Sequence, residues 1–169
     1  MKRLVIPFLF LLALAVPYAV GSGQESPESA AVVKTIRDFA KAITSFPKTT
    51  DEESILKFYD KDYEGISDGE SSNLLEMQNI VKEIAEAIDL GNPFRWSLRV
   101  QSIEPHVIGQ IAWVTFSYTM KVGAEGEVLA KEEGLATAIL RKKGTKWLIL
   151  HDHMSTPKPE ELQIEIEEE

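Results

Sequence analysis

The stretch LRKKGTKWLILHDHMS, residues 140–155, decides the fold that we expect of this chain. Apolar residues surround a charged turn at Lys143–Gly144, a pattern typical of a β-hairpin. Three earlier stretches are also rich in β-branched and aromatic residues: residues 94–104, 111–122 and 128–141. Only short turns separate the four strands, at residues 105–109, 123–126 and 143–144. Long strands with such short connections predict an antiparallel meander.

Helical periodicity precedes the strands. Ser26 can cap a helix that has Pro27 at its first position, and apolar residues recur every three or four residues up to Ser45. We expect Pro47 to end this helix.

Capping boxes predict two further helices. Thr49 with Glu52, or Thr50 with Glu53, can begin a short second helix, and Asn73 with Glu76 can begin a third that reaches Ile88. Residues 60–69 lie between them and have the composition of a polar loop.

Three helices followed by long strands predict an α+β fold, in which three N-terminal helices pack on a strongly curved antiparallel sheet. Gly134, inside the third predicted strand, indicates a bulge that bends it. We expect the helices to cover the concave face.

The first residues have the layout of a secretory signal. Lys2 and Arg3 precede an apolar run that ends in small residues, which predicts a signal peptide over residues 1–21. Residues 22–26 would be a linker, 27–157 the domain, and 158–169 an acidic disordered tail. The protein would then be exported, to the periplasm or outside the cell. An uncleaved segment would instead anchor it in a membrane.

Charge and cysteine content exclude several classes of function. The 169 residues hold 18 Lys and Arg against 27 Asp and Glu, a formal charge of −9, and contain no cysteine. Disulfides, thiolate metal sites and a cysteine nucleophile are therefore excluded. The negative charge also argues against a nucleic-acid partner.

Two segments of the chain resemble the SnoaL-like, or ketosteroid isomerase-like, branch of the nuclear transport factor 2-like superfamily. They are residues 58–69 and the final hairpin, residues 140–155, with its charged turn, Lys-Trp pair and His-x-His-x-Ser ending. The resemblance extends over residues 28–157 and implies a cone of helices on a curved sheet. It also implies a range of functions, because this superfamily includes isomerases, cyclases, dehydratases and non-catalytic binding or assembly domains.

The final strand supplies the first candidate site residues. His151 and His153 are two residues apart on a strand, so both side chains point to one face, with Asp152 and Met154 on the other. We expect His151, His153 and Ser155 to contact a ligand, and His153 could act as an acid or base. A metal would need a third ligand that the sequence does not identify, so we predict no metal and no cofactor.

The segment after the second helix supplies a second group of candidates. Asp62 could remove a proton next to a carbonyl, as a ketosteroid isomerase-like reaction requires. Tyr63, beside it, could contact a ligand. The same acids would also serve an ordinary polar turn.

The strand over residues 111–122 separates an apolar face from a more polar one. Phe116 and Tyr118 lie on the apolar face, which we expect to line a cavity under the helices. Trp113, Thr115 and Ser117 lie on the other face, which could form a homodimer. His106 falls in a predicted turn, where we expect a surface role.

Three functions remain possible from the sequence. The first is an exported domain that binds a small molecule in a partly apolar pocket, as a binding or accessory domain. The second is an isomerase, cyclase or dehydratase that uses His153 or Asp62 as its base. The third is a dimeric assembly domain that pairs through the outer sheet face.

Overall fold

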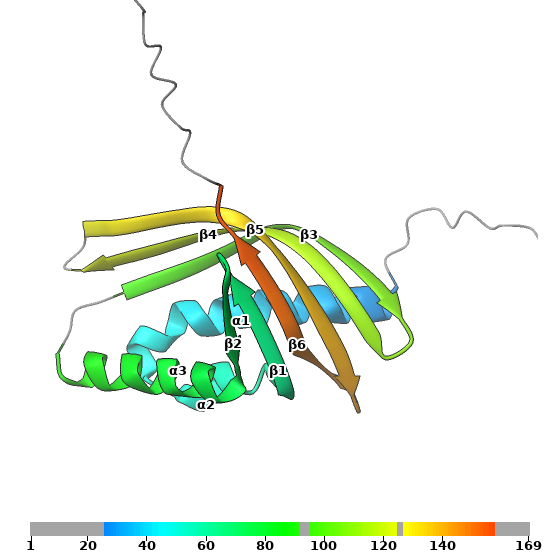
Figure 1. The fold of residues 1–169 in the computed structure, drawn as a ribbon, viewed down its shortest axis with the longest axis horizontal. Helices are drawn as coiled ribbons and strands as arrows, with labels where there is room; N and C mark the ends of the chain where they lie inside the picture. Colours follow the sequence, from blue (N-terminus) through cyan, green and yellow to red (C-terminus); the bar gives the residue numbers. More distant parts are fainter. Residues whose placement is uncertain (1–25, 92–94, 125–126, 158–169) are drawn as a thin grey trace, which may run out of the picture.

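The computed structural model describes residues 26–91, 95–124 and 127–157. The predicted signal peptide, most of the linker and the acidic tail lie outside these residues. Three helices pack on one six-stranded sheet, so the predicted α+β class is confirmed (Figure 1). The helices are α1 (Pro27–Thr49), α2 (Glu52–Leu56) and α3 (Leu74–Asp89). None of the described helices is long and apolar enough to span a membrane.

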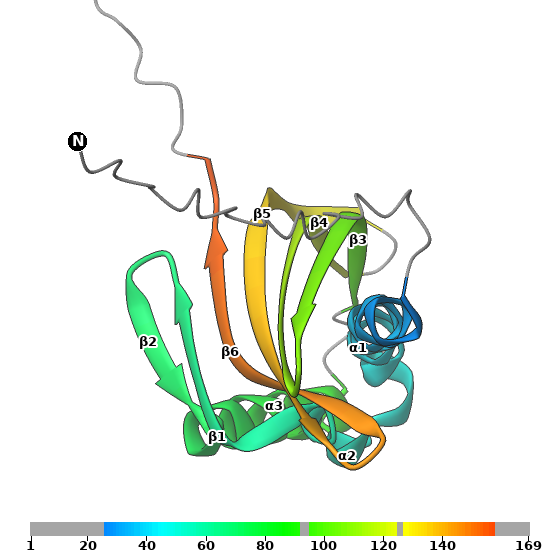
Figure 2. The same cartoon turned by 90° about the vertical axis from the view of Figure 1, so that its right-hand side faces the viewer.

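The sheet contains two more strands than the sequence predicts. Its strands are β1 (Tyr59–Ser67), β2 (Glu70–Asn73), β3 (Arg95–Ile108), β4 (Ile111–Ala124), β5 (Glu127–Lys143) and β6 (Lys146–Ser155). Their order across the sheet is β2-β1-β6-β5-β4-β3. The last four strands form the predicted antiparallel meander, whereas β1 pairs with β6 in parallel. The sheet curves strongly, and α1 lies along its inner side beside β3 (Figure 2).

The prediction of a polar loop over residues 60–69 is wrong, because these residues form most of β1. Asp68 and Gly69 both have positive φ, of 46° and 94°, and turn the chain into β2. β2 is an edge strand of four residues, and most side chains of this hairpin outside Tyr59, Asp60, Tyr63 and Gly65 are exposed. Such a polar edge hairpin has the composition of a loop, so periodicity alone does not reveal it.

The prediction that Pro47 ends the first helix is also wrong. The helix begins as expected, with the Ser26 side chain accepting from the Ser29 backbone, but it continues through Pro47 to Thr49. A proline inside a helix leaves the carbonyl four residues earlier without its usual donor. Here that carbonyl, of Ile43, accepts a 2.8 Å hydrogen bond from the indole nitrogen of Trp96 on β3. A distant side chain therefore compensates for the proline.

Of the capping boxes predicted from the sequence, the one at Asn73 forms and the two at Thr49 and Thr50 do not. The Asn73 side chain accepts from the Glu76 backbone at 3.1 Å, and Glu76 accepts from the Asn73 backbone at 2.8 Å. α2 begins instead after Asp51, which makes no side-chain cap. The two threonine boxes predicted there are wrong, because α1 still includes Thr49 and Thr50 is its left-handed C-cap.

Two predictions about the strands need correction. β3 continues through Pro105 and His106 to Ile108, and the turn follows at Gly109. A proline is tolerated there because β3 is an edge strand. The pairing of β5 with β4 shifts register at Gly123 of β4, and its pairing with β6 shifts at Leu140, so no bulge lies at Gly134. This glycine instead allows close packing, since a Cβ there would overlap the Ser155 carbonyl oxygen.

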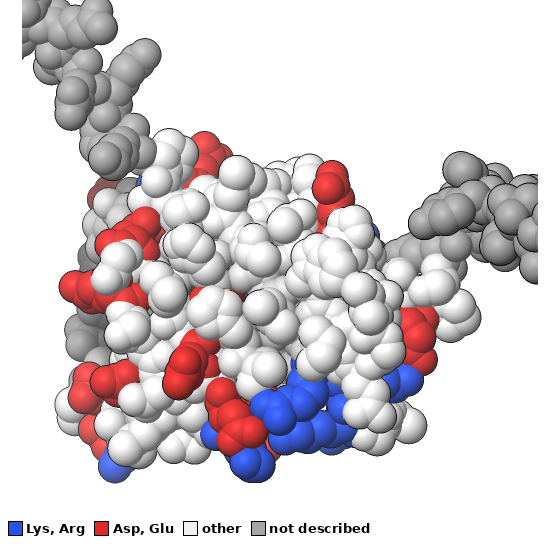
Figure 3. All heavy atoms as spheres, turned by 45° about the vertical axis from the view of Figure 1, so that its right-hand side comes forward, with Lys and Arg blue, Asp and Glu red and all other residues white. Residues whose placement is uncertain are grey.

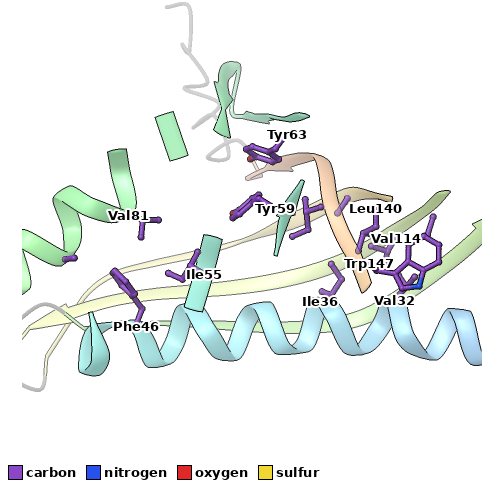
Figure 4. Packing of buried hydrophobic residues seen from close by; sticks show 14 residues of the cluster. Val32, Ile36, Phe46, Ile55, Tyr59, Tyr63, Val81, Val114, Leu140 and Trp147 are labelled. Carbon is purple, nitrogen blue, oxygen red and sulfur yellow. The ribbon is translucent and has the colours of Figure 1, made fainter. Parts of the chain in front are cut away.

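The core lies between α1, α2, α3 and the inner face of the sheet. Its side chains come from every layer (Figure 4), with Ile36 and Phe46 from α1, Ile55 from α2, Val81 from α3 and Leu140 from β5. All five are almost completely buried. Each fully buried aliphatic or aromatic side chain contributes roughly 1.5–3 kcal/mol. The cluster therefore fixes the curved sheet on which the candidate site lies.

Candidate functional site

The side chains of β6 alternate between the two faces of the sheet, and this alternation shifts by one residue at Leu150. On the β5 side, Leu140 pairs with Ile149 and Ile139 pairs with His151, so Leu150 is an extra residue without a partner. One extra residue exchanges the two faces of a strand from that point on. Trp147 and Ile149 point into the core before it, and Asp152 and Met154 share the inner face after it.

Asp152 contacts a phenol from the parallel strand β1. The Tyr63 hydroxyl donates a hydrogen bond of 3.1 Å to Oδ1 of Asp152. Gly65 is the β1 residue opposite Asp152, and a Cβ there would overlap the Tyr63 hydroxyl and come within 2.8 Å of Oδ1. The ring of Tyr59 packs edge-on against that of Tyr63, with 4.5 Å between centroids. Glycine and tyrosine thus hold this carboxyl–phenol pair in place.

Burial determines the protonation of the pair. Desolvation raises the pKa of Asp152, although the Tyr63 hydrogen bond and the charges of His151 and His153 act in the opposite direction. Desolvation and the neighbouring Asp152 also raise the pKa of Tyr63 well above its usual range. Tyr63 is therefore a hydrogen-bond donor at neutral pH. A carboxyl group with a raised pKa can exchange a proton with a ligand.

A second carboxyl–phenol pair lies toward the hairpin that joins the end of β4 to the start of β5. The buried Tyr118 hydroxyl donates to Oε1 of Glu132 at 2.6 Å. Desolvation and this contact raise the pKa of Tyr118, so it too remains protonated. Gly134, opposite Tyr118, leaves room for the ring, since a Cβ there would lie 2.7 Å from the hydroxyl.

Apolar side chains separate the two pairs. Ala136 on β5 pairs with Phe116 on one side and with Met154 on the other, and these larger side chains are only partly buried. Solvent therefore reaches an apolar surface with a carboxyl–phenol pair on each side. We call this region the inner-face site. It comprises Tyr63, Phe116, Tyr118, Glu132, Asp152 and Met154.

The structure brings three of the candidate ligand-binding residues to the inner-face site: Tyr63, Phe116 and Tyr118. It places His151, His153 and Ser155 on the opposite face, and His153 and Ser155 are exposed there. If the side chains alternated regularly from Trp147 onward, these three residues would point inward, but the extra residue Leu150 exchanges the two faces. The roles assigned to these residues stay predictions.

Asp62, the candidate base, lies at the surface. Its carboxylate contacts Lys61 at 2.6 Å and Arg141 at 3.1 Å, and these contacts, led by the Lys61 hydrogen bond, lower its pKa. A carboxylate held ionised in this way is a weak base.

Asp60 is the buried acid that sequence reasoning missed in this segment. It is completely buried, and it contacts Lys143 at 2.9 Å and Arg141 at 3.3 Å. Burial alone would raise the pKa of Asp60, but the two cations and the Asp62 backbone hold it below the usual range. This network joins the start of β1 to the end of β5.

Asp152 and Glu132 were also not foreseen as site residues. Glu132 stands in a charged run and Asp152 stands between two histidines, so only the register of the strands identifies them as inner residues. Among the described residues, no group of three or more His, Asp or Glu side chains could hold a metal ion.

Comparison with known proteins identifies the family. A model of the SnoaL-like domain matches residues 32–159. The chain belongs to this family. A comparison of this SnoaL-like domain with curated proteins gave no match.

Solved structures share the fold at low sequence identity. A protein from Streptomyces avermitilis, described as a "putative dehydratase" of the NTF2-like family, is 15% identical, with 79% of this chain and 100% of that chain covered and a TM-score of 0.63. An NTF2-like protein of unknown function from Pseudomonas putida is also 15% identical, with coverages of 83% and 94% and a TM-score of 0.61. One from Shewanella oneidensis is 18% identical, with coverages of 73% and 98% and a TM-score of 0.53. These likenesses concern the fold.

Proposed function

We propose that this SnoaL-like domain binds a small, partly apolar molecule at the inner-face site. The observation that supports the proposal is the pairing of Asp152 with Tyr63 beside the partly exposed Phe116 and Met154. Small-molecule sites are mostly apolar and contain a few polar groups that fix orientation. The expected ligand has a flat apolar body and a hydroxyl or carbonyl group that contacts the carboxyl–phenol pair.

An uncharged naphthol tests this proposal. Saturation-transfer difference NMR with 2-naphthol should give a signal that falls by at least about half in Asp152→Asn, which replaces the carboxyl group, and in Phe116→Ala, which removes apolar contact. Thr115→Ala is the matched control, because Thr115 is exposed on the other face of β4. Equal signals in all four proteins would remove the proposed binding site.

We propose in addition that the domain works after export. The basic start and apolar run of residues 1–21 support this, and the mature chain would begin at Ser22. Mass spectrometry of the protein from the exported fraction of its host measures the mature N-terminus. A chain that retains residues 1–21 there would contradict cleavage.

A second candidate function is acid–base catalysis at the same site, as in an isomerase, cyclase or dehydratase. The supporting observation is the raised pKa of Asp152 beside a protonated phenol. Perturbed acids in partly enclosed sites are candidates for catalysis. Asp152 would accept a proton next to a carbonyl, and Tyr63 would stay a donor.

Deuterium exchange separates this candidate from simple binding. The α-protons of 2-tetralone should exchange in D2O faster with the wild-type protein than with Asp152→Asn, while Asp62→Asn behaves like the wild type. Exchange at the buffer rate with every protein would leave binding as the function. General acid–base catalysis typically contributes about 10²–10⁴-fold, so the difference is measurable.

We also propose a homodimer through the outer sheet face. Large apolar side chains exposed there include Trp113 (38%), Leu135 (67%) and Ile108 (69%). An exposed apolar row on one face is typical of an interaction surface. Light scattering should give a dimer for the wild type and a monomer for Trp113→Glu, and a wild-type monomer at high concentration would contradict the proposal.

A further inference from the structure

A hollow outside the inner-face site lies between α1, α2 and the turn that joins β5 to β6. Its volume is about 730 Å³, within the range of small-molecule sites. Figure 2 shows the β5–β6 hairpin beside α2 and α1. Phe58, Trp147 and Leu148 contribute apolar lining to this α1–α2 groove.

The charge of the groove is opposite to that of the chain. Four lysines line it, against one carboxylate, that of Asp38: Lys34, Lys41, Lys57 and Lys146. The whole chain has a formal charge of −9. Figure 3 shows a group of basic side chains at the lower edge of the face drawn, with acidic side chains beside it and elsewhere on that face. A local cationic lining in an acidic protein attracts anions selectively.

Two of the lysines have no carboxylate partner among the described residues. Asp38 pairs with Lys34 and with Lys41, the latter at 3.5 Å. Within the described part of the chain, Lys57 and Lys146 form no ion pair. The ammonium of Lys57 lies 5.4 Å from the centre of the Phe58 ring, so a cation and an aromatic surface adjoin each other.

Hydroxyl groups complete the polar lining. Ser54 and Thr145 line the groove on its α2 and turn sides, and among the described residues neither side chain makes a hydrogen bond. An anion held by Lys57 and Lys146 would therefore find further donors close by. A carboxylate accepts several such hydrogen bonds at once.

We propose that the α1–α2 groove binds an amphipathic carboxylate, whose apolar body lies along Phe58 and Trp147 and whose carboxylate contacts Lys57 and Lys146. The apolar lining accounts for the body and the two unpaired lysines for the charge. This site is separate from the inner-face site, so the two can be tested independently.

Isothermal titration calorimetry with dodecanoate, below its micelle concentration, tests the groove. The double variant Lys57→Ala/Lys146→Ala should bind at least about ten-fold more weakly, because charge-assisted hydrogen bonds are lost. The matched control is Lys48→Ala/Lys121→Ala, which removes two exposed lysines outside the groove lining. It should bind within about two-fold of the wild type, since its groove is unchanged.

Two more measurements make the outcome decisive. Dodecanol, which lacks the charge, should bind more weakly than dodecanoate, and Asp152→Asn should leave dodecanoate binding unchanged. Equal binding by the two lysine double variants would overturn the proposal, as would dodecanol binding as tightly as dodecanoate. Loss of binding in Asp152→Asn would place dodecanoate at the inner-face site instead and would also overturn it. Circular dichroism of each variant checks that it is folded.

Discussion

Tyr63 on β1 and Asp152 on β6 are 89 residues apart in sequence and are joined by a 3.1 Å hydrogen bond. The contact exists because β1 pairs in parallel with β6 and because Gly65 leaves space for both side chains. The phenol and the carboxyl group therefore influence each other's pKa, and each can be altered by a separate substitution.

Replacing Tyr63 with Phe should raise the pKa of Asp152 further. The hydrogen bond from Tyr63 stabilises the carboxylate and so opposes the effect of burial. Carbon-13 NMR titration of the Asp152 carboxyl measures the shift. Tyr118→Phe serves as the control and should leave this titration unchanged, because Tyr118 contacts Glu132.

Replacing Asp152 with Asn should stabilise the fold at neutral pH. Burial raises the pKa of Asp152 above the unfolded value of about 3.9, so the wild type loses stability as pH rises from that value through the folded pKa. The amide side chain of the variant would not ionise and would keep an oxygen that accepts from Tyr63. Melting temperatures should therefore differ at pH 7 and converge below about pH 4. A lower melting temperature for Asp152→Asn at pH 7 would show that the carboxylate stabilises the fold.

Replacing Asp60 with Asn should destabilise the fold by about 2–3 kcal/mol at pH 7. A lost buried ion pair costs about 3–5 kcal/mol, and Lys143 and Arg141 are exposed enough to recover some hydration. Asp62→Asn is the matched control, since it removes an exposed partner of the same Arg141 and should cost less than about 1 kcal/mol. Urea unfolding measures both, and equal costs would contradict the role given to Asp60.

The same network gives a pH dependence of the opposite sign. The pKa of Asp60 is lowered in the folded state, so its contribution is complete above the unfolded value of about 3.9 and is lost as pH falls through the folded pKa. The difference between the wild type and Asp60→Asn should therefore shrink in strongly acidic solution. A difference that stays constant down to pH 2 would show that the effect of Asp60 is not electrostatic.

Replacing Gly134 with Ala should cost about 1–3 kcal/mol, because the new Cβ would overlap a backbone oxygen that cannot move aside. Leu135→Ala is the control. Its side chain is 67% exposed on the other face, so its cost should be within about 0.5 kcal/mol. Thermal or urea unfolding measures the two costs, and a tolerated Gly134→Ala would show that β5 and β6 can separate locally.

Much of the fold could be predicted because it depends on local patterns. The three helices, the four long strands, the Asn73 cap and the inner position of Phe116 all follow from periodicity or capping chemistry. The continuation of α1 through Pro47 could not be predicted, because the compensating hydrogen bond to the Ile43 carbonyl comes from Trp96, 53 residues beyond Ile43. Partners so distant in sequence leave no local signal.

The candidate site was predictable only in part. Tyr118 lies on a strand whose faces can be assigned, whereas Tyr63 lies on a strand with the composition of a loop, and Asp152 required the register between β5 and β6. The same register removes His151 and His153 from the inner face. Composition cannot show which residue of a strand lacks a partner, and here that residue is Leu150.

The extra residue in β6 also affects how knowledge can be transferred between relatives. A relative that lacks the equivalent of Leu150 is one residue shorter in this strand. A sequence alignment that places no gap there would match its inner residues to His151 and His153, which face outward here. Functional residues of SnoaL-like proteins should therefore be compared through strand pairing in three dimensions. If Leu150 instead took a regular place in the pairing with β5, His151 and His153 would face inward, and the inner surface would carry imidazoles in place of the carboxyl group.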